Sequence, residues 1–233
     1  MRKSIFITGT DTDVGKTFVA SLIVKTLRDN GVEAGYFKGV LSGAIKEDNK
    51  LIPGDAKEVC SLSGLNEDYE NLVSYTLENP YSPHLASRIE GIDINIEKIK
   101  SDYKKMKDKY ELLVVEGSGG IICPINITDT KTILLEDIIK ELELSTIVIA
   151  RAGLGTINHT ILTIKYLEAE GIKVNGVILN GYNPQNIIHK DNKDIIRHLT
   201  SINRILTIPF VEKEKDNVDN LINFNMLISL ING

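Results

Sequence analysis

Glycine, lysine and threonine stand together in the stretch GTDTDVGKT at residues 9–17. This stretch follows an apolar run at residues 5–7 and precedes a helix-like segment at residues 18–27. A glycine-rich turn between a strand and a helix directs backbone N–H groups and the positive end of the helix dipole toward anionic oxygens. Lys16 adds a full charge near the β- and γ-phosphates, and the Thr17 hydroxyl can coordinate Mg²⁺. The stretch therefore predicts a phosphate-binding loop.

The spacing within this loop departs from the standard pattern by one residue. Five residues separate Gly9 from Gly15, so the usual four-residue spacing would start at Thr10. We therefore expect Gly9 to end the preceding strand and Gly15 to let the backbone approach a phosphate closely. An ordinary glycine turn is the alternative, and the strand before the loop and the helix after it argue against that alternative.

A carboxylate follows the apolar run at residues 112–115. Glu116 stands there, immediately before the glycine-rich segment at residues 117–120. In nucleotide-hydrolysing α/β proteins a carboxylate at this place, usually Asp, contacts Mg²⁺. A buried and unpaired carboxylate costs several kcal/mol, so Glu116 needs a cation or hydrogen-bond donors nearby. We predict that it lies close to the metal of a metal–nucleotide complex.

Lys38 and Asp55 are two further candidates. Lys38 falls where a second strand, residues 34–38, is expected to end before a flexible loop. Ligands gather beyond the carboxyl ends of parallel strands, so Lys38 can face the crevice of the phosphate loop; an isolated surface lysine is the alternative. Asp55 precedes a helical segment and has Glu58 three residues later, so it can be an N-cap or a carboxylate directed at Mg²⁺. The spacing does not distinguish these two roles.

Two later strand ends also carry polar groups. Residues 151–159 join a strand at residues 147–150 to a helix, and small residues at a helix N-terminus expose backbone donors suited to a carboxylate or phosphate. A tight turn capped by Thr156 is the alternative. Asn180 ends an apolar run at residues 174–179, where its amide can pair with a base edge or stabilise the turn.

The elements that position these residues alternate between strand and helix. Runs that are apolar on both faces are typical of central strands in a parallel sheet covered by helices on each side. Amphipathic stripes predict surface helices between the strands, and residues 218–231 predict a closing helix. The stripes consist of Ile96, Ile99, Tyr103 and Met106, and of Ile157, Ile161, Ile164 and Leu167. We therefore predict an α/β fold, a single domain over residues 1–233 with a mostly parallel central sheet flanked by helices on both faces.

Composition argues against several classes of function. The net charge is −5 with lysines dispersed among acids, which argues against a nucleic-acid surface. No apolar stretch approaches the ~20 residues that a membrane span needs. Residues 1–3 are basic, but the apolar run after them is too short for a secretory signal, so we expect a cytoplasmic protein.

The cysteines and histidines do not form a recognisable site. Cys60 and Cys123 are far apart and lack a CxxC pair, so we expect buried, reduced thiols. The histidines show no common metal-ligand spacing, and no nucleophile motif supports covalent acyl chemistry. The histidines are His84, His159, His189 and His198.

Taken together, the motifs resemble those of the dethiobiotin synthetases, ATP-dependent enzymes of biotin synthesis, along almost the whole chain. Many ATPases share a phosphate loop, whereas the Ser-Pro-His and Gly-Thr-Ile-Asn-His elements are more restrictive. The matching segments are GTDTDVGKT at 9–17, residues 38–43, Gly54 with Asp55, PYSPHLA at 80–86, VEGSGG at 115–120, LGTINH at 154–159, and Asn180. The chain departs from the family pattern at Gly39, where a proline is usual, and at Asp13, where Glu is common.

The resemblance implies a reaction. The substrate would be 7,8-diaminopelargonate, a nine-carbon acid with vicinal amines, and one amine would take up CO₂ as a carbamate. A carbamate oxygen would attack the γ-phosphate of ATP, and the mixed anhydride would close onto the neighbouring amine. Such chemistry depends on placing two anions together and neutralising their charge.

The resemblance also implies roles for single residues and a P-loop NTPase-like fold. Lys16 and Lys38 would neutralise charge, with Thr12 and Ser42 also at the reacting groups, and each site of a homodimer would borrow a loop from its partner. The nucleotide would contact Asp13, Val14, Gly15, Lys16, Thr17, Glu116, Asn180 and Pro209; Mg²⁺ would contact Thr17, Asp55 and Glu116. The diamine or carbamate would border Thr12, Asp13, Lys38 and Ser42, and the substrate carboxylate would meet Leu154, Gly155, Thr156 and Asn158.

Two other classes compete with this interpretation. A MinD-type regulatory ATPase would use nucleotide to control dimerisation, but such proteins typically carry an additional lysine early in the loop, where this chain has Thr10, Asp11 and Thr12. An amidoligase domain related to cobyrinate synthesis would normally come with a glutaminase domain, for which this chain is too short.

Overall fold

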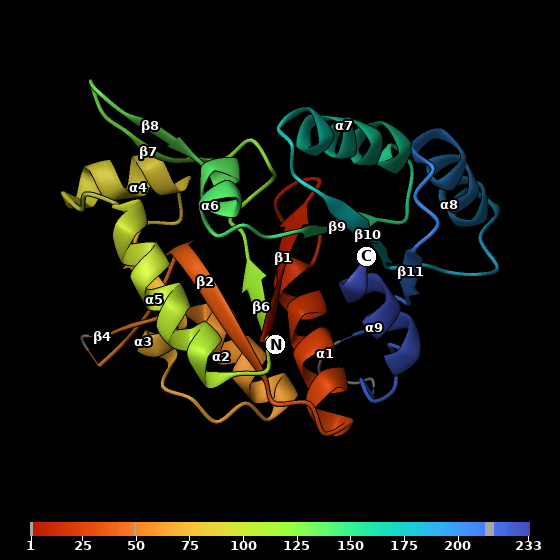
Figure 1. Ribbon diagram of the computed structural model, residues 1–233, viewed down its shortest axis with the longest axis horizontal. Helices are drawn as coiled ribbons and strands as arrows, with labels where there is room; N and C mark the ends of the chain where they lie inside the picture. The colour runs from red at the N-terminus through yellow and green to blue at the C-terminus, as the bar shows by residue number, and fades with distance from the viewer. Residues whose placement is uncertain (1, 49, 213–216) are drawn as a thin grey trace.

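A seven-stranded parallel sheet runs through the centre of the chain (Figure 1). The structure is a computed structural model that describes residues 2–48, 50–212 and 217–233; residue 1, in the basic N-terminal segment, lies outside them. The strand order is β11-β10-β9-β1-β6-β2-β5. The strands are β1 (Lys3–Gly9), β2 (Ala34–Ser42), β5 (Val73–Leu77), β6 (Leu112–Glu116), β9 (Thr146–Arg151), β10 (Val174–Asn180) and β11 (Ile205–Ile208).

Two small antiparallel pairs lie outside this sheet. They are β3 (Ile45–Glu47) with β4 (Lys50–Ile52), and β7 (Pro124–Ile127) with β8 (Thr132–Leu134). The helices are α1 (Lys16–Asp29), α2 (Gly54–Ser63), α3 (Tyr69–Leu72), α4 (Pro83–Glu90), α5 (Ile96–Lys109), α6 (Leu135–Glu141), α7 (Thr156–Ala169), α8 (Ile187–Thr200) and α9 (Phe224–Asn232).

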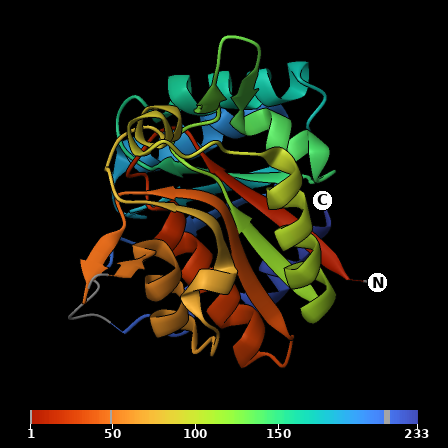
Figure 2. The ribbon, with the colours of Figure 1, turned by 90° about the vertical axis from the view of Figure 1, so that its left-hand side faces the viewer.

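Helices cover both faces of the sheet, as the apolar strands predict. Helices α1 and α2 lie on one face, and α5 and α6 lie on the other (Figure 2). Strands β6, β1, β9 and β10 are buried along most of their length, which is the expected state of central parallel strands. None of the described helices has the length and apolar character needed to cross a membrane. The predicted fold class is confirmed.

Strand β2 is longer than predicted, and Lys38 lies in its middle instead of at its end. One edge of β2 pairs with β6 from Ala34 to Lys38, and the other edge pairs with β5 from Lys38 to Ser42. Hydrogen bonds to β5, a strand distant in the sequence, therefore extend β2 beyond the predicted end. The prediction of a flexible loop after Lys38 is wrong, because residues 39–42 belong to this strand. Gly39 also packs closely against α5, since a Cβ there would lie 3.3 Å from Ile99 Cγ2.

Three helix predictions also need correction. Helix α2 begins at Gly54 with Pro53 as its N-cap, so Asp55 lies in the first turn and is not the cap. Helix α7 begins at Thr156 with Gly155 as its N-cap, so Thr156 does not cap it either. The last helix begins at Phe224 and not at residue 218, because the Asn223 side chain accepts a hydrogen bond from the Met226 N–H and starts the helix there.

The buried side of α7 is rotated from the predicted stripe. Ile164 and Leu167 are buried as predicted, but Ile157 and Ile161 are only half-buried. Threonines share the core-facing side instead, and the hydroxyls of Thr156 and Thr160 lie 3.2 Å apart. Polar side chains that satisfy one another can replace apolar ones in a helix–sheet contact, which a count of apolar positions misses. The predicted stripe of α5, in contrast, is buried throughout.

Candidate functional site

The phosphate loop leaves β1 at Gly9, as predicted, and enters α1 at Lys16. Asp13 and Gly15 both have left-handed backbone conformations, with φ of 57° and 91°. The Lys16 ammonium donates a hydrogen bond to the Asp11 carbonyl across the loop at 3.0 Å. A side chain at Gly9 would meet Val14 Cγ2 at 2.8 Å, so the tight turn requires glycine there. The loop therefore has the concave shape that an anion site needs.

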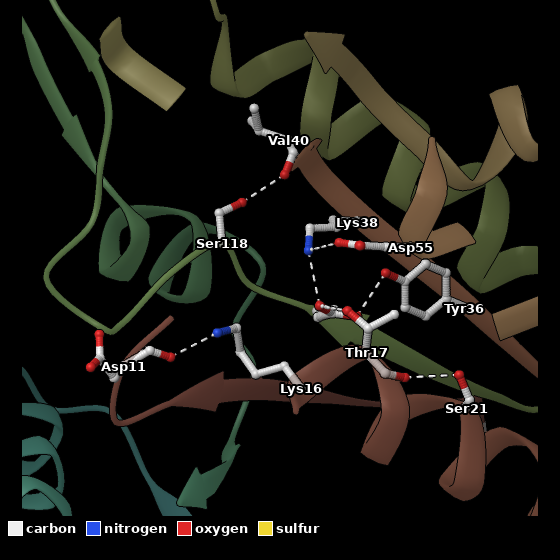
Figure 3. Close-up of polar contacts among 10 residues, drawn as sticks. Asp11, Lys16, Thr17, Ser21, Tyr36, Lys38, Val40, Asp55 and Ser118 are labelled. Carbon is white, nitrogen blue, oxygen red and sulfur yellow. Dashed lines mark hydrogen bonds and ion pairs between the residues drawn. The ribbon is translucent and has the colours of Figure 1, made fainter. Parts of the chain in front are cut away.

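A buried ionic cluster lies beside the loop (Figure 3). Lys38 Nζ donates to Asp55 Oδ2 at 2.5 Å and to Glu116 Oε1 at 2.9 Å. The Thr17 hydroxyl donates to the same Glu116 oxygen at 2.8 Å, and the Tyr36 hydroxyl donates to Glu116 Oε2 at 2.8 Å. The Glu116 side chain is 1% exposed. It therefore has the cation and the donors that its burial requires.

The sheet brings this cluster together. Lys38 and Glu116 are register partners on the neighbouring parallel strands β2 and β6, so their side chains leave the same face of the sheet. Tyr36 stands two residues before Lys38 and shares that face. Thr17 in the first turn of α1 and Asp55 in the first turn of α2 approach from the helices that cover it.

Burial and charge set the protonation of the cluster. Burial lowers the pKa of Lys16, an effect that Glu116 opposes and the like charge of Lys38 reinforces. Burial also acts to lower the pKa of Lys38, but the Glu116 and Asp55 carboxylates outweigh it and raise that pKa above its usual value. Burial, and then the Glu116 charge, raises the pKa of Tyr36. Lys38 thus stays an ammonium and Tyr36 stays a hydrogen-bond donor at neutral pH.

Two cavities open on either side of the loop. The first, about 810 Å³, extends from Lys38 past the loop to Asn180 and Phe210. The second, about 920 Å³, extends from the loop to residues 80–83 and to Tyr166 of α7. The two cavities share Thr12, Asp13, Ser42, Ser118 and Gly119. Two ligands could therefore meet at this common wall.

Most of the residues singled out from the sequence line the first cavity. They are Thr12, Asp13, Val14, Gly15, Lys16, Thr17, Lys38, Ser42, Asp55, Glu116 and Asn180. Pro209 does not line it, although its neighbours Phe210 and Val211 do. The predicted carboxylate-binding residues Leu154, Gly155, Thr156 and Asn158 line neither cavity, and Leu154 is 91% exposed at the surface.

Sequence reasoning assigned no role to several residues at or beside the site. Tyr36 is buried and lines neither cavity, but its contact with the cluster could have been found, because a residue two positions before Lys38 on a strand must share its face. Arg151 Nη2 donates to the Thr12 carbonyl of the loop at 3.2 Å, a contact across 139 residues that no local pattern indicates. His189 of α8 reaches the first cavity only because of how α8 packs.

Asn180, the last residue of β10 two strands away from β1, contacts the phosphate loop. Its side-chain Nδ2 donates to the Val14 carbonyl at 3.0 Å, and its Oδ1 accepts from the Gly181 N–H at 3.1 Å. A Cβ at Gly15 would lie 2.2 Å from Asn180 Nδ2. The absence of a side chain at Gly15 is thus what lets Asn180 reach the loop.

The donor set beside the loop suits a hard cation. Thr17, Asp55 and Glu116 offer a hydroxyl and two carboxylates, and Mg²⁺ prefers oxygen ligands and shares them with phosphates. Within the described residues, no group of three or more His, Cys, Asp or Glu side chains is placed to hold a metal. A metal bound here would therefore take part of its coordination from a nucleotide or water.

Comparison with known proteins agrees with this architecture. A family model described as an AAA domain matches residues 3–217. The ATP-dependent dethiobiotin synthetase of Clostridium perfringens (strain 13 / Type A) is 58% identical over 212 residues, which are 91% of this chain and 92% of that protein. The protein of that name from Clostridium novyi (strain NT) is 57% identical over 217 residues, 93% of this chain and 90% of that protein.

Solved structures share the fold at low sequence identity. A plasmid partition protein of Borrelia burgdorferi bound to AMPPNP has a TM-score of 0.58 and 13% identity, covering 98% of this chain and 97% of that chain. The MinC:MinD cell division protein complex of Aquifex aeolicus has a TM-score of 0.57 and 15% identity, covering 99% of this chain and 94% of that chain. These likenesses concern the fold, whereas the identity to the clostridial proteins extends along nine tenths of the sequence, and the chain belongs to the dethiobiotin synthetase family.

Proposed function

We propose that this chain is an ATP-dependent dethiobiotin synthetase that joins CO₂ to 7,8-diaminopelargonate and closes the cyclic urea. The observation that carries the proposal is the wall shared by the two cavities, where Thr12, Asp13 and Ser42 face both. ATP would occupy the first cavity, along Gly15, Lys16 and Thr17. The diamine would occupy the second, so that its carbamate meets the γ-phosphate at the shared wall.

The chain's own charges suit the proposed steps. A carbamate oxygen attacks the γ-phosphorus and ADP leaves; the neighbouring amine then attacks the carbonyl carbon of the mixed anhydride, and phosphate leaves. Lys16 and Lys38 bring positive charge to the two anions, and both line the first cavity beside Ser42. Because ring closure within one molecule is already favoured by proximity, positioning and charge neutralisation are the main tasks of the protein.

The residues proposed to bind Mg²⁺ and the adenine base lie in or beside the first cavity. Thr17, Asp55 and Glu116 would hold Mg²⁺, which neutralises phosphate charge when bound. Lys38 contacts both carboxylates, so it would have to share them with the metal. Asn180 would hydrogen-bond to the adenine, and Pro209, which follows β11, would contact the same base. To do so the Asn180 amide must give up its hydrogen bond to the Val14 carbonyl or accept a bond through a remaining lone pair of its oxygen.

We also propose a homodimer of one-domain chains, residues 1–233, acting in the cytoplasm. Leu154, Gly155 and Asn158 are exposed around the start of α7, Thr156 is buried there, and none of the four lines a cavity of its own chain. Backbone N–H groups at that helix start suit a carboxylate. A second copy could therefore present this turn to the substrate. The buried, unbridged cysteines suit a reducing compartment.

One assay tests the proposed function. The pure protein is incubated with MgATP and bicarbonate, with and without the diamine, while phosphate release and product mass are followed. We expect diamine-dependent phosphate release with formation of dethiobiotin, one phosphate for each product molecule. Phosphate release that ignores the diamine would contradict the synthetase function and favour a MinD-type regulatory ATPase.

A further inference from the structure

Tyr36 makes a buried hydrogen bond to a carboxylate of the ionic cluster. Its hydroxyl donates to Glu116 Oε2 at 2.8 Å, and Figure 3 shows Tyr36 beside Thr17, Lys38 and Asp55 of the cluster. Neither Tyr36 nor Glu116 is more than 2% exposed. Hydrogen bonds to ionised acceptors are about twice as strong as bonds between neutral groups. Low dielectric around the pair strengthens it further. The contact thus fixes one of the two oxygens of Glu116.

The other oxygen of Glu116 faces the phosphate loop. Oε1 accepts from the Thr17 hydroxyl at 2.8 Å and from Lys38 Nζ at 2.9 Å. The carboxylate therefore has an inner oxygen held by Tyr36 and an outer oxygen directed at the proposed metal-binding side. Without the phenol, the carboxylate plane of Glu116 could tilt about the last side-chain bond, since that torsion is broad, and the oxygen that faces Thr17 would then point elsewhere.

The hydroxyl has a specific partner, which packing alone does not require. The Tyr36 ring is fully buried, and phenylalanine would fill nearly the same volume in β2. Tyr103 of α5 provides a contrast, because its hydroxyl is buried and has no hydrogen-bond partner among the described residues. Substitution by phenylalanine keeps the buried ring at both positions. Comparing the two variants therefore isolates the effect of a hydroxyl that has a hydrogen-bond partner.

We infer that Tyr36 is a positioning residue that holds Glu116 with Oε1 toward Thr17 and so sets the protein's affinity for a divalent metal–nucleotide complex. The inference rests on the proposed function, in which Thr17, Asp55 and Glu116 hold Mg²⁺. Outer partners that orient metal ligands typically change metal affinity by about 10- to 100-fold when they are removed. In the proposed function the loop backbone and Lys16 make the metal-free contacts to the nucleotide, and Tyr36 does not line the cavity that would hold it.

The test compares Tyr36→Phe with wild type and uses Tyr103→Phe as the matched control. Calorimetry measures ADP binding in EDTA and across a Mg²⁺ titration, and urea unfolding reports on folding. For Tyr36→Phe we expect unchanged metal-free ADP affinity and a Mg²⁺ midpoint raised by about 10- to 100-fold. Tyr103→Phe should leave both quantities unchanged. An unchanged Mg²⁺ midpoint in Tyr36→Phe, or equal losses with and without metal, would overturn the inference.

A second comparison covers the case in which Tyr36→Phe alone folds poorly. In the Glu116→Gln background residue 116 carries no charge. Removing the Tyr36 hydroxyl there leaves no buried carboxylate without its hydrogen-bond donor, so the double variant is expected to fold. There the hydroxyl should change the Mg²⁺ midpoint by less than about twofold, because the carboxylate it orients is gone. A tenfold further change would overturn the inference. If wild type itself binds ADP without regard to Mg²⁺, the proposed metal site fails, which is a separate outcome from a failure of Tyr36.

Discussion

Lys38 Nζ lies 2.9 Å from Glu116 Oε1, and the two residues are direct register partners on the adjacent parallel strands β2 and β6. Their closeness is therefore set by the central sheet and not by a loop. Lys38 also holds Asp55 of α2, so one ammonium joins two carboxylates from different elements at the edge of the first cavity. A rigid sheet keeps a charged group in place more precisely than a loop does.

Lys38→Met is expected to reduce turnover far more than nucleotide affinity. The ammonium is proposed to neutralise charge on the transferring phosphoryl group, and loss of one such electrostatic partner typically reduces kcat by about 10²- to 10³-fold. Steady-state kinetics with the diamine, together with calorimetric ADP binding, separates the two effects. Lys46→Met is the control, because Lys46 lies on the exposed strand β3 and forms its ion pair with Glu78. Wild-type turnover in Lys38→Met would remove the proposed role.

Gly15→Ala is expected to weaken ATP binding and to destabilise the loop. The new Cβ would lie 2.2 Å from Asn180 Nδ2, and the left-handed backbone at Gly15 adds strain. Gly64→Ala controls for strain alone, because Gly64 is also left-handed but nothing lies within 4 Å of its Cβ position. Adding Asn180→Ala to Gly15→Ala should restore part of the stability, measured by urea unfolding. No rescue would show that the Asn180 contact is not what excludes a side chain.

The thiol of Cys123 is expected to react slowly at pH 8 and much faster at high pH. Burial raises its pKa to about 11, although Lys16 and Lys38 act in the opposite direction. At pH 8, about one thiol in a thousand is then ionised, and the rate should rise about tenfold for each pH unit up to about pH 11. Iodoacetamide labelling of Cys60→Ser followed by mass spectrometry measures this rate.

Diaminopelargonate should slow the same labelling, because Cys123 lines the second cavity. ADP alone, which is proposed to occupy the first cavity, should protect much less. Equal protection by both ligands would contradict the separate assignment of the two cavities.

Leu154→Asp is expected to break the proposed dimer. Leu154 is 91% exposed at the start of α7, and burying a carboxylate in an apolar contact between subunits is costly. Sedimentation measures the oligomeric state. Loss of the dimer should raise the apparent KM for the diamine, whereas the affinity for ADP should not change. Ile187→Asp, at another exposed apolar position at the start of α8, is the control. A monomeric wild type would contradict the dimer before any variant is made.

Sequence alone determined the parts of the site that are local. Residues 9–17 form one contiguous loop, and its strand, turn and helix follow from short-range apolar pattern and glycine chemistry. Glu116 was placed at a strand end for the same reason, because an apolar run delivers it there. Such features depend on interactions between residues that are close together in the chain, so the order of residues is enough to predict them.

Only the tertiary structure decided which distant groups meet. Pairing with β5 carries β2 past Lys38, and the shared face of β2 and β6 brings the Tyr36 hydroxyl to Glu116, which is 80 residues away. Hydrogen bonds between strands and contacts between buried side chains depend on which segments become neighbours after folding. A periodicity or a motif in one segment does not contain that information, and for this reason the orientation of Glu116 became visible only in the fold.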